Sequence, residues 1–134
     1  MASAILRKAV GQVKMGRKGY AWAILAGSNA ALAAISAKLI SFPVNSPAAF
    51  YTIRCVVMFN VVMWGCYVQS LRDLSTLQAT ATNFAANFLT SGFAGSLLFG
   101  ELLKLQWFAG AFLIVIGVLV LSTSTTEERK ERLD

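Results

Sequence analysis

The sequence predicts an all-α, polytopic membrane protein in which four transmembrane helices form a bundle. The first observation is composition: 57% of the 134 residues are hydrophobic and only 13% are charged. A soluble domain carries about 25% charged residues, so much of this surface is expected to face lipid. The second is the run from Phe108 to Leu121, which contains no polar side chain. The third is that stretches of spanning length recur. They lie at about residues 20–40, 48–68, 76–99 and 102–122.

Residues 1–19 form a basic N-terminal segment with five basic side chains and no acidic one. Apolar residues recur within it at the spacing of an amphipathic helix, and it lacks the apolar core of a secretory signal. We favour a cytoplasmic segment that lies against anionic headgroups. An organelle transit peptide, which is also basic and poor in acids, is the alternative.

The first span is expected at about residues 20–40. Tyr20 and Trp22 mark its start, because their amphipathic rings favour the membrane interface. Small side chains then share one stripe, which lets another helix approach closely in lipid. The stripe consists of Ala23, Gly27, Ala30, Ala34 and Ala37. Lys38, in the last turn, is expected to extend its ammonium to water.

The second span is expected at about residues 48–68, after a proline-containing turn, SFPVNSP. Arg54 lies about 9 Å along this helix from its expected start at Ala48, at about 1.5 Å per residue. A charge at that depth is a candidate anion-binding group, although its side chain is long enough to reach the interface. Cys55 and Cys66 lie in the same apolar segment without a CxxC spacing, so we interpret them as small hydrophobic residues.

The third span, at about residues 76–99, is the least apolar. Five polar residues share one of its faces: Thr76, Thr80, Asn83, Asn87 and Thr90. Asparagine amides cannot face lipid without a large cost, so this face is expected to line the bundle, a partner or a wet cavity. Thr80, Asn83, Asn87 and Thr90 are therefore candidates for a solute path. The alternative is that they hydrogen-bond between helices, at about 0.6 kcal/mol for each bond.

The fourth span is expected at about residues 102–122, followed by a charged cytoplasmic tail over 123–134. Glu101 stands in the turn before it, where a carboxylate complements the helix dipole. Alternatively, Glu101 acts as a gate or as the partner of Arg54. Gly110 and Gly117 are seven residues apart, and this spacing predicts a flat seam through which two copies associate.

The basic residues predict the orientation of the chain. Four spans put both termini on one side, and that side collects nine Lys and Arg residues against three on the other. Cytoplasmic segments carry such an excess. Both termini are therefore expected in the cytoplasm.

The residue inventory argues against several function classes. The chain has no histidine, and four of its six acidic residues lie in the last eight positions. Few groups are left for acid–base catalysis or for holding a metal. We expect no catalytic residues, no metal, no cofactor and no nucleic-acid partner. The expected partners are membrane lipids, other transmembrane helices and a small organic solute.

Residues 99–121 resemble the end of a drug/metabolite-transporter repeat, of the EamA-like and small-multidrug-resistance group. In that group a Gly-Glu pair precedes a final helix of the form G-x-x-L-I-x-x-G-V. Here the pair is Gly100-Glu101, and the helix reads GAFLIVIGV from Gly110. The stretches AGSNAALAAISAKL and ATATNFAANFLTSGFAGSLLFGE are similar, more closely still, to the transmembrane protein 42 family, a four-helix branch of that superfamily. The resemblance covers about residues 20–121 and implies a solute-transporter fold.

One departure from the resembled group matters. The small multidrug exporters keep a membrane-embedded glutamate in their first helix that exchanges protons for cationic drugs. This sequence has no acidic residue between Met1 and Gln69. Proton-coupled export of cations by that mechanism is therefore disfavoured.

Four helices are too few to enclose a solute path, so transport is expected to need a homodimer or a heteromer. Inverted repeats require units of opposite orientation, but the charge bias orients every copy in the same way. Three possibilities remain: a parallel dimer, a heteromer, or a protein without transport activity. We expect a small-solute transporter that acts as an oligomer. The alternative is a membrane scaffold or assembly subunit that packs against partner helices.

Overall fold

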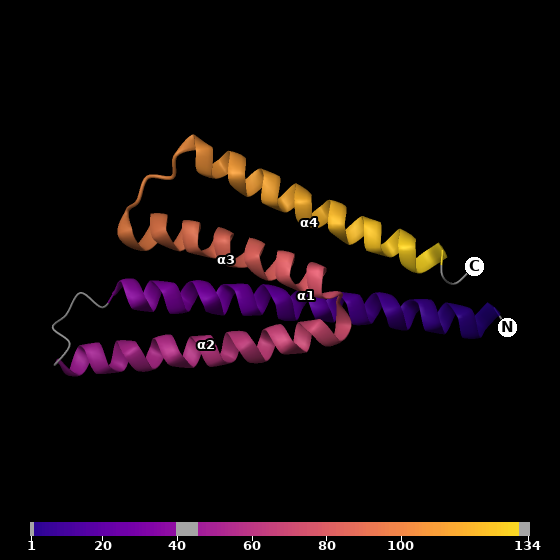
Figure 1. The fold of residues 1–134 in the computed structure, drawn as a ribbon, viewed down its shortest axis with the longest axis horizontal. Helices are drawn as coiled ribbons and strands as arrows, with labels where there is room; N and C mark the ends of the chain where they lie inside the picture. The colour runs from indigo at the N-terminus through magenta and orange to yellow at the C-terminus, as the bar shows by residue number, and fades with distance from the viewer. Residues whose placement is uncertain (1, 40–45, 132–134) are drawn as a thin grey trace.

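The computed structural model describes residues 2–39 and 46–131, and over these residues it contains four helices and no strand (Figure 1). The helices are α1 (Ala2–Lys38), α2 (Pro47–Asp73), α3 (Thr76–Phe99) and α4 (Leu105–Glu131). The predicted all-α fold class and the four-helix arrangement are confirmed. Most of the predicted SFPVNSP turn and residues 132–134 of the predicted tail lie outside the described residues.

Three helices of the described chain are long and apolar enough to cross a membrane. Their spanning parts are Val13–Lys38, Pro47–Asp73 and Leu105–Ser124. α3 was expected to be a fourth span. Its 24 residues are long enough at about 1.5 Å per residue, but its threonines and asparagines leave it less apolar than the other three. The structure is therefore compatible with a multi-pass membrane protein in which three helices contain strongly apolar spans. α3 has several hydroxyl and amide side chains but no charged one.

The bounds of α1, α2 and α4 differ from those predicted, and α2 also ends later than expected, at Asp73. α1 begins at Ala2, because no proline interrupts the basic segment, so no break marks the expected boundary at residue 20. α2 begins at Pro47, behind Ser46, whose hydroxyl accepts a hydrogen bond from the Ala49 amide. α4 begins at Leu105 and continues through the tail to Glu131. α3 has the predicted bounds.

α1 lies in the middle of the bundle, packed against α2 on one side and against α3 on the other (Figure 1). The backbone of α4 approaches α3 only. α1 begins and α4 ends at the same end of the bundle (Figure 1).

The buried core consists of small side chains. Its hydrophobic members include Ala23, Ala26, Ala31, Ala33, Ala49 and Ala79. The predicted stripe on α1 is only partly correct: Ala23 and Gly27 are buried, whereas Ala34 and Ala37 are exposed. The reason is that α1 packs on two helices, α2 and α3, so its buried small residues are divided between two faces of the helix. Large apolar side chains point outward instead, as in Val61 and Phe112, each 66% exposed. Such a surface is suited to lipid and not to water.

A tight turn joins α2 to α3 against the side of α1. Ser75 caps α3 with a capping box that includes Gln78, and Leu74 packs where Gly19 has no side chain. A Cβ at Gly19 would lie 2.7 Å from Leu74 Cγ. The N-terminal part of α1 projects beyond this turn (Figure 1).

α4 is fastened to the bundle near both ends of its apolar part. Near its start, the Trp107 ring lies over Gly92 and stacks on Phe88, with ring centroids 5.5 Å apart. Phe93 meets the same indole edge-on at 5.6 Å. At the other end, the Tyr20 hydroxyl donates a hydrogen bond of 2.9 Å to Ser122 Oγ. Between these two attachments α4 stands away from α1.

Candidate functional site

The four candidate residues on α3 occupy different environments. The Thr80 hydroxyl donates to the Thr76 carbonyl at 2.7 Å and accepts from the Tyr67 hydroxyl at 2.8 Å. Because both of its hydrogen-bonding roles are filled, Thr80 fastens α3 to α2. This side chain forms an interhelical hydrogen bond, and Thr80 itself is exposed.

Asn83 lies at the closest approach of α3 to α1. A Cβ at Gly27 would overlap the Asn83 carbonyl oxygen and would lie 2.6 Å from Ala86 Cβ. The side-chain oxygen Oδ1 of Asn83 is buried and has no hydrogen-bond partner among the residues that the structure describes. The glycine in α1 is therefore what brings the two backbones together, and it leaves an amide oxygen available inside the bundle.

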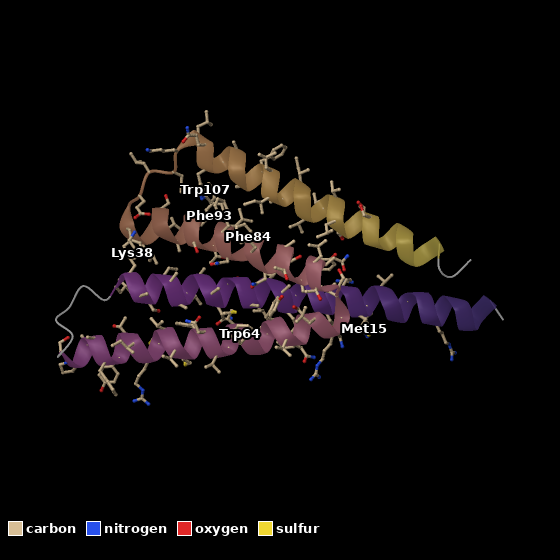
Figure 2. All side chains as sticks on the ribbon, viewed as in Figure 1. Met15, Lys38, Trp64, Phe84, Phe93 and Trp107 are labelled. Atoms are coloured by element: carbon tan, nitrogen blue, oxygen red, sulfur yellow. The ribbon has the colours of Figure 1, made fainter. Side chains whose placement is uncertain are left out.

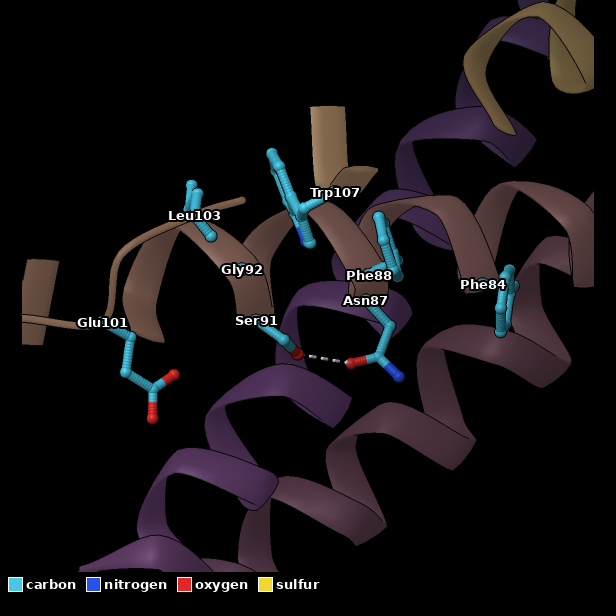
Figure 3. Close-up of a pocket in the computed structure, with 8 residues that line it drawn as sticks. All are labelled: Phe84, Asn87, Phe88, Ser91, Gly92, Glu101, Leu103 and Trp107. Atoms are coloured by element: carbon cyan, nitrogen blue, oxygen red, sulfur yellow. Dashed lines mark hydrogen bonds between the residues drawn. The ribbon is translucent and has the colours of Figure 1, made fainter. Parts of the chain in front are cut away.

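Asn87 lines what we call the aromatic pocket, a cavity of about 400 Å³ between α3 and the α3–α4 connection (Figure 3). Its side-chain oxygen accepts a hydrogen bond of 3.2 Å from the Ser91 hydroxyl. The pocket is lined by Phe84, Asn87, Phe88, Ser91, Gly92, Glu101, Leu103 and Trp107. It combines an amide, a hydroxyl and a carboxylate with three aromatic rings.

Thr90 lines a second cavity of about 320 Å³, which we call the central cavity, between α1, α3 and α4. Two more hydroxyls line it, from Ser28 and Thr82. Thr82 is only 5% exposed, and its hydroxyl has no hydrogen-bond partner in the described part of the chain. The other lining residues are apolar: Ile24, Ala85, Ala86, Leu89, Val115, Val118 and Leu119. The central cavity is thus an apolar space with a few hydroxyl groups.

Glu101 forms an ion pair with Lys38 and not with Arg54, so the predicted pairing with Arg54 is wrong. Lys38 Nζ also lies 4.3 Å from the centre of the Phe99 ring. The carboxylate does not cap α4 either, because that helix begins only at Leu105. Glu101 instead follows Gly100, whose φ of 64° ends α3 in the left-handed region.

The Lys38–Glu101 pair joins the end of α1 to the end of α3. Its side chains are 48% and 56% exposed. Exposed ion pairs contribute about 0–1 kcal/mol, so this contact opens easily. Glu101 also lines the aromatic pocket, whereas Lys38 does not.

Arg54 lies on the exposed surface of α2, where its guanidinium sits 5.5 Å from the centre of the Phe50 ring. α2 and α4 pack on opposite sides of the pair formed by α1 and α3 (Figure 1). Arg54 is consequently separated from Glu101 and from both cavities described above. It remains a candidate for contact with an anion only at the outer surface.

Gly110 and Gly117 line neither of these cavities. A Cβ at either position would meet no neighbouring atom of the described residues within 4 Å, apart from the backbone of its own helix. The two glycines therefore lie on an open part of α4. This placement is what a seam to a second molecule requires.

Sequence reasoning missed four residues of these sites: Lys38, Thr82, Ser91 and Trp107. Thr82 lies outside the predicted polar stripe of α3. No sequence signal separated Thr82 from the other threonines of α3, because it follows Ala81 and directly precedes Asn83 of the predicted stripe. In the described residues no group of three or more His, Cys, Asp or Glu could hold a metal ion, and Cys55 and Cys66 are free thiols.

Comparison of the chain with protein-family models and with solved structures finds no match.

Proposed function

We propose that this protein is a small-solute transporter of the drug/metabolite-transporter type, which acts as an oligomer and takes its solute in the central cavity. The observation that carries this proposal is that Thr82, a residue that lines that cavity, has a buried hydroxyl without a partner among the described residues. A buried hydroxyl left unpaired costs about 1–3 kcal/mol. A solute with a carbonyl or hydroxyl group recovers that cost when it binds.

The lining of the central cavity supports a neutral and mainly apolar solute. Seven of its ten residues are apolar, and the other three carry hydroxyl groups. No charged side chain of the described residues lines it. A charged solute would lose its hydration there without a compensating partner, whereas a neutral molecule with one or two polar groups would not.

An oligomer would enclose the solute site, which a single chain leaves open on one side. Small-molecule sites usually enclose most of the surface of their ligand, but here α4 stands apart from α1 between its two attachments. A second molecule packed along α4 would close the open side. The nine-to-three bias of basic residues orients all copies alike, with both termini in the cytoplasm.

The test is uptake of a panel of neutral metabolites into liposomes that contain the purified protein. We expect Thr82→Val to lower the uptake of the transported solute by on the order of tenfold, because one buried hydrogen bond is lost without a change of side-chain volume. Thr52→Val is the control, since the Thr52 hydroxyl on α2 donates to the Ala48 carbonyl, away from the cavity. Uptake no faster than in protein-free liposomes for every solute would contradict the proposal.

The second candidate is a scaffold that docks partner helices without transport. It is favoured by the open surface of α4 around Gly110 and Gly117. Labelling with an impermeant thiol reagent distinguishes the two functions, on a background in which Cys55 and Cys66 are replaced by serine. Cysteines at positions 82 and 90 react if the central cavity is a wet path. Complete protection at both positions favours the scaffold.

A further inference from the structure

A third cavity, which we call the boundary cavity, lies where α1 passes the last turn of α2. Its volume is about 600 Å³. One face of α1 supplies Met15, Lys18, Trp22 and Leu25, and α2 supplies Gln69 and Asp73. Figure 2 shows Met15 on α1 next to the end of α2. Unlike the central cavity, this one places two opposite charges beside apolar and aromatic side chains.

The spacing of two lysines on α1 suggests a membrane level for the boundary cavity. Lys18 and Lys38 are 20 residues apart on the same continuous helix, which corresponds to about 30 Å at 1.5 Å per residue. The hydrocarbon core of a bilayer is also about 30 Å thick. If Lys38 marks one boundary, Lys18 marks the other. Trp22 then sits just inside that boundary, where its amphipathic ring is favoured.

The two charged side chains of the boundary cavity, Lys18 and Asp73, remain available to a ligand. No ion pair joins Lys18 to Asp73 in the described residues, where the one ion pair is that of Lys38 with Glu101. Gly19 holds the end of α2 close to α1, because a Cβ there would lie 2.8 Å from Asp73 Cβ. The cavity is therefore built with a cation and an anion that face the same space, next to the Gln69 amide.

We propose that the boundary cavity binds the headgroup of phosphatidylethanolamine. The phosphate faces the Lys18 ammonium, and the ammonium of the lipid donates hydrogen bonds to the Asp73 carboxylate. The start of the acyl chains lies along Trp22 and Leu25, which are 37% and 49% exposed. Both headgroup contacts are hydrogen bonds between charged groups, the stronger kind.

Charge complementarity selects this lipid over the other common headgroups. The phosphate of phosphatidylglycerol would satisfy Lys18, but that headgroup has no cation to pair with Asp73. Phosphatidylcholine has both charges, but its trimethylammonium has no N–H to donate. Arg17 and Arg72 are exposed near the cavity but do not line it, so their attraction for phosphate is common to all phospholipids.

The test is native mass spectrometry of the full-length protein, released from nanodiscs that contain equal amounts of phosphatidylethanolamine, phosphatidylglycerol and phosphatidylcholine. We expect phosphatidylethanolamine to be retained preferentially. Retention should fall stepwise in the series of mono-, di- and trimethylated headgroups, because each methyl group removes one N–H donor. Lys18→Gln and Asp73→Asn should each lower its retention on the order of tenfold or more, as expected for the loss of one charge-assisted hydrogen bond.

Arg17→Gln is the matched control, since it removes a neighbouring charge that does not line the cavity, and it should leave the preference unchanged. Size-exclusion chromatography and circular dichroism establish that each variant is folded. If Asp73→Asn fails to fold, the methylation series with the unchanged protein decides. Equal retention of the three lipids, or preferential retention of phosphatidylglycerol, would overturn the proposal. These outcomes do not depend on whether the protein transports a solute.

Discussion

At the scale of single residues, glycine determines how closely the helices approach one another. Gly27 allows α1 to pack on the α3 backbone at Asn83, and Gly92 provides the flat surface on which the Trp107 ring lies. Gly110 and Gly117 have open space instead. In lipid, where apolar surface gains little from burial, such close packing is a main source of helix association. Identical residues thus have different consequences according to their neighbours.

The first prediction concerns Gly27. We expect Gly27→Ala to lower the free energy of unfolding by about 1–3 kcal/mol, the range for an added methyl group in a tightly packed interior. The reason is that the new Cβ would overlap the Asn83 carbonyl oxygen, a backbone atom that cannot move without displacing α3. Titration with a denaturing detergent in mixed micelles, followed by circular dichroism, measures the change.

Gly65→Ala is the matched control for this substitution. Gly65 lies on α2, where an added Cβ would meet nothing within 4 Å apart from its own helix backbone. Alanine is favoured over glycine within a helix by about 0.5–1 kcal/mol, so this variant should be as stable as the unchanged protein or slightly more stable. Equal effects of the two substitutions would show that Gly27 does not set the α1–α3 distance.

At the scale of helices, α3 and α4 behave differently from α1 and α2. α3 distributes its polar face over three neighbours: Thr80 bonds to α2, Asn83 lies against α1, and Asn87 faces the aromatic pocket. α4 is attached mainly through Trp107 and through the hydrogen bond between Tyr20 and Ser122. An element held at two points exchanges and opens more readily than one packed along its length.

The second prediction follows from this attachment of α4. We expect Trp107→Ala to increase hydrogen–deuterium exchange over the first turns of α4, because the indole's contacts with Phe88, Phe93 and Gly92 are lost. Exchange in α2 should not change, since α2 has no backbone contact with α4. Mass spectrometry of peptic fragments measures both. Tyr20→Phe should act only at the far end of α4, and a uniform increase over all helices would contradict this view.

At the scale of the whole molecule, the sequence predicted the number of helices and the lipid-facing character of the fold. Periodic apolar runs depend on local composition, and they are visible without coordinates. Contacts between distant residues are not visible in this way. The pairing of Lys38 with Glu101 required the ends of α1 and α3 to meet, and the central cavity required α4 to stand apart from α1. The sequence showed that polar residues recur along one side of α3. It could not show that they face three different environments, because that depends on how the helices pack.

The third prediction concerns the assembly of two copies through α4. In a parallel dimer with two-fold symmetry, each residue near the axis meets its own counterpart. We therefore expect Gly110→Cys to cross-link to itself, and Gly117→Cys to do the same, on a background in which Cys55 and Cys66 are replaced by serine. A disulfide requires Cα atoms about 5.5 Å apart, a separation that the open space beside both glycines permits. Non-reducing electrophoresis after mild oxidation in the membrane measures the dimer.

An antiparallel dimer centred between the two glycines gives a different pattern. Position 110 of one copy then meets position 117 of the other, so cross-links form only when the two variants are mixed. The two positions are about 10.5 Å apart along α4, at about 1.5 Å per residue, and a cysteine pair cannot bridge that offset. Phe112→Cys is the control, because Phe112 lies on the opposite side of the helix. Since the nine-to-three bias of basic residues gives every copy the same orientation, a mixed-only pattern would contradict both the parallel seam and the predicted topology.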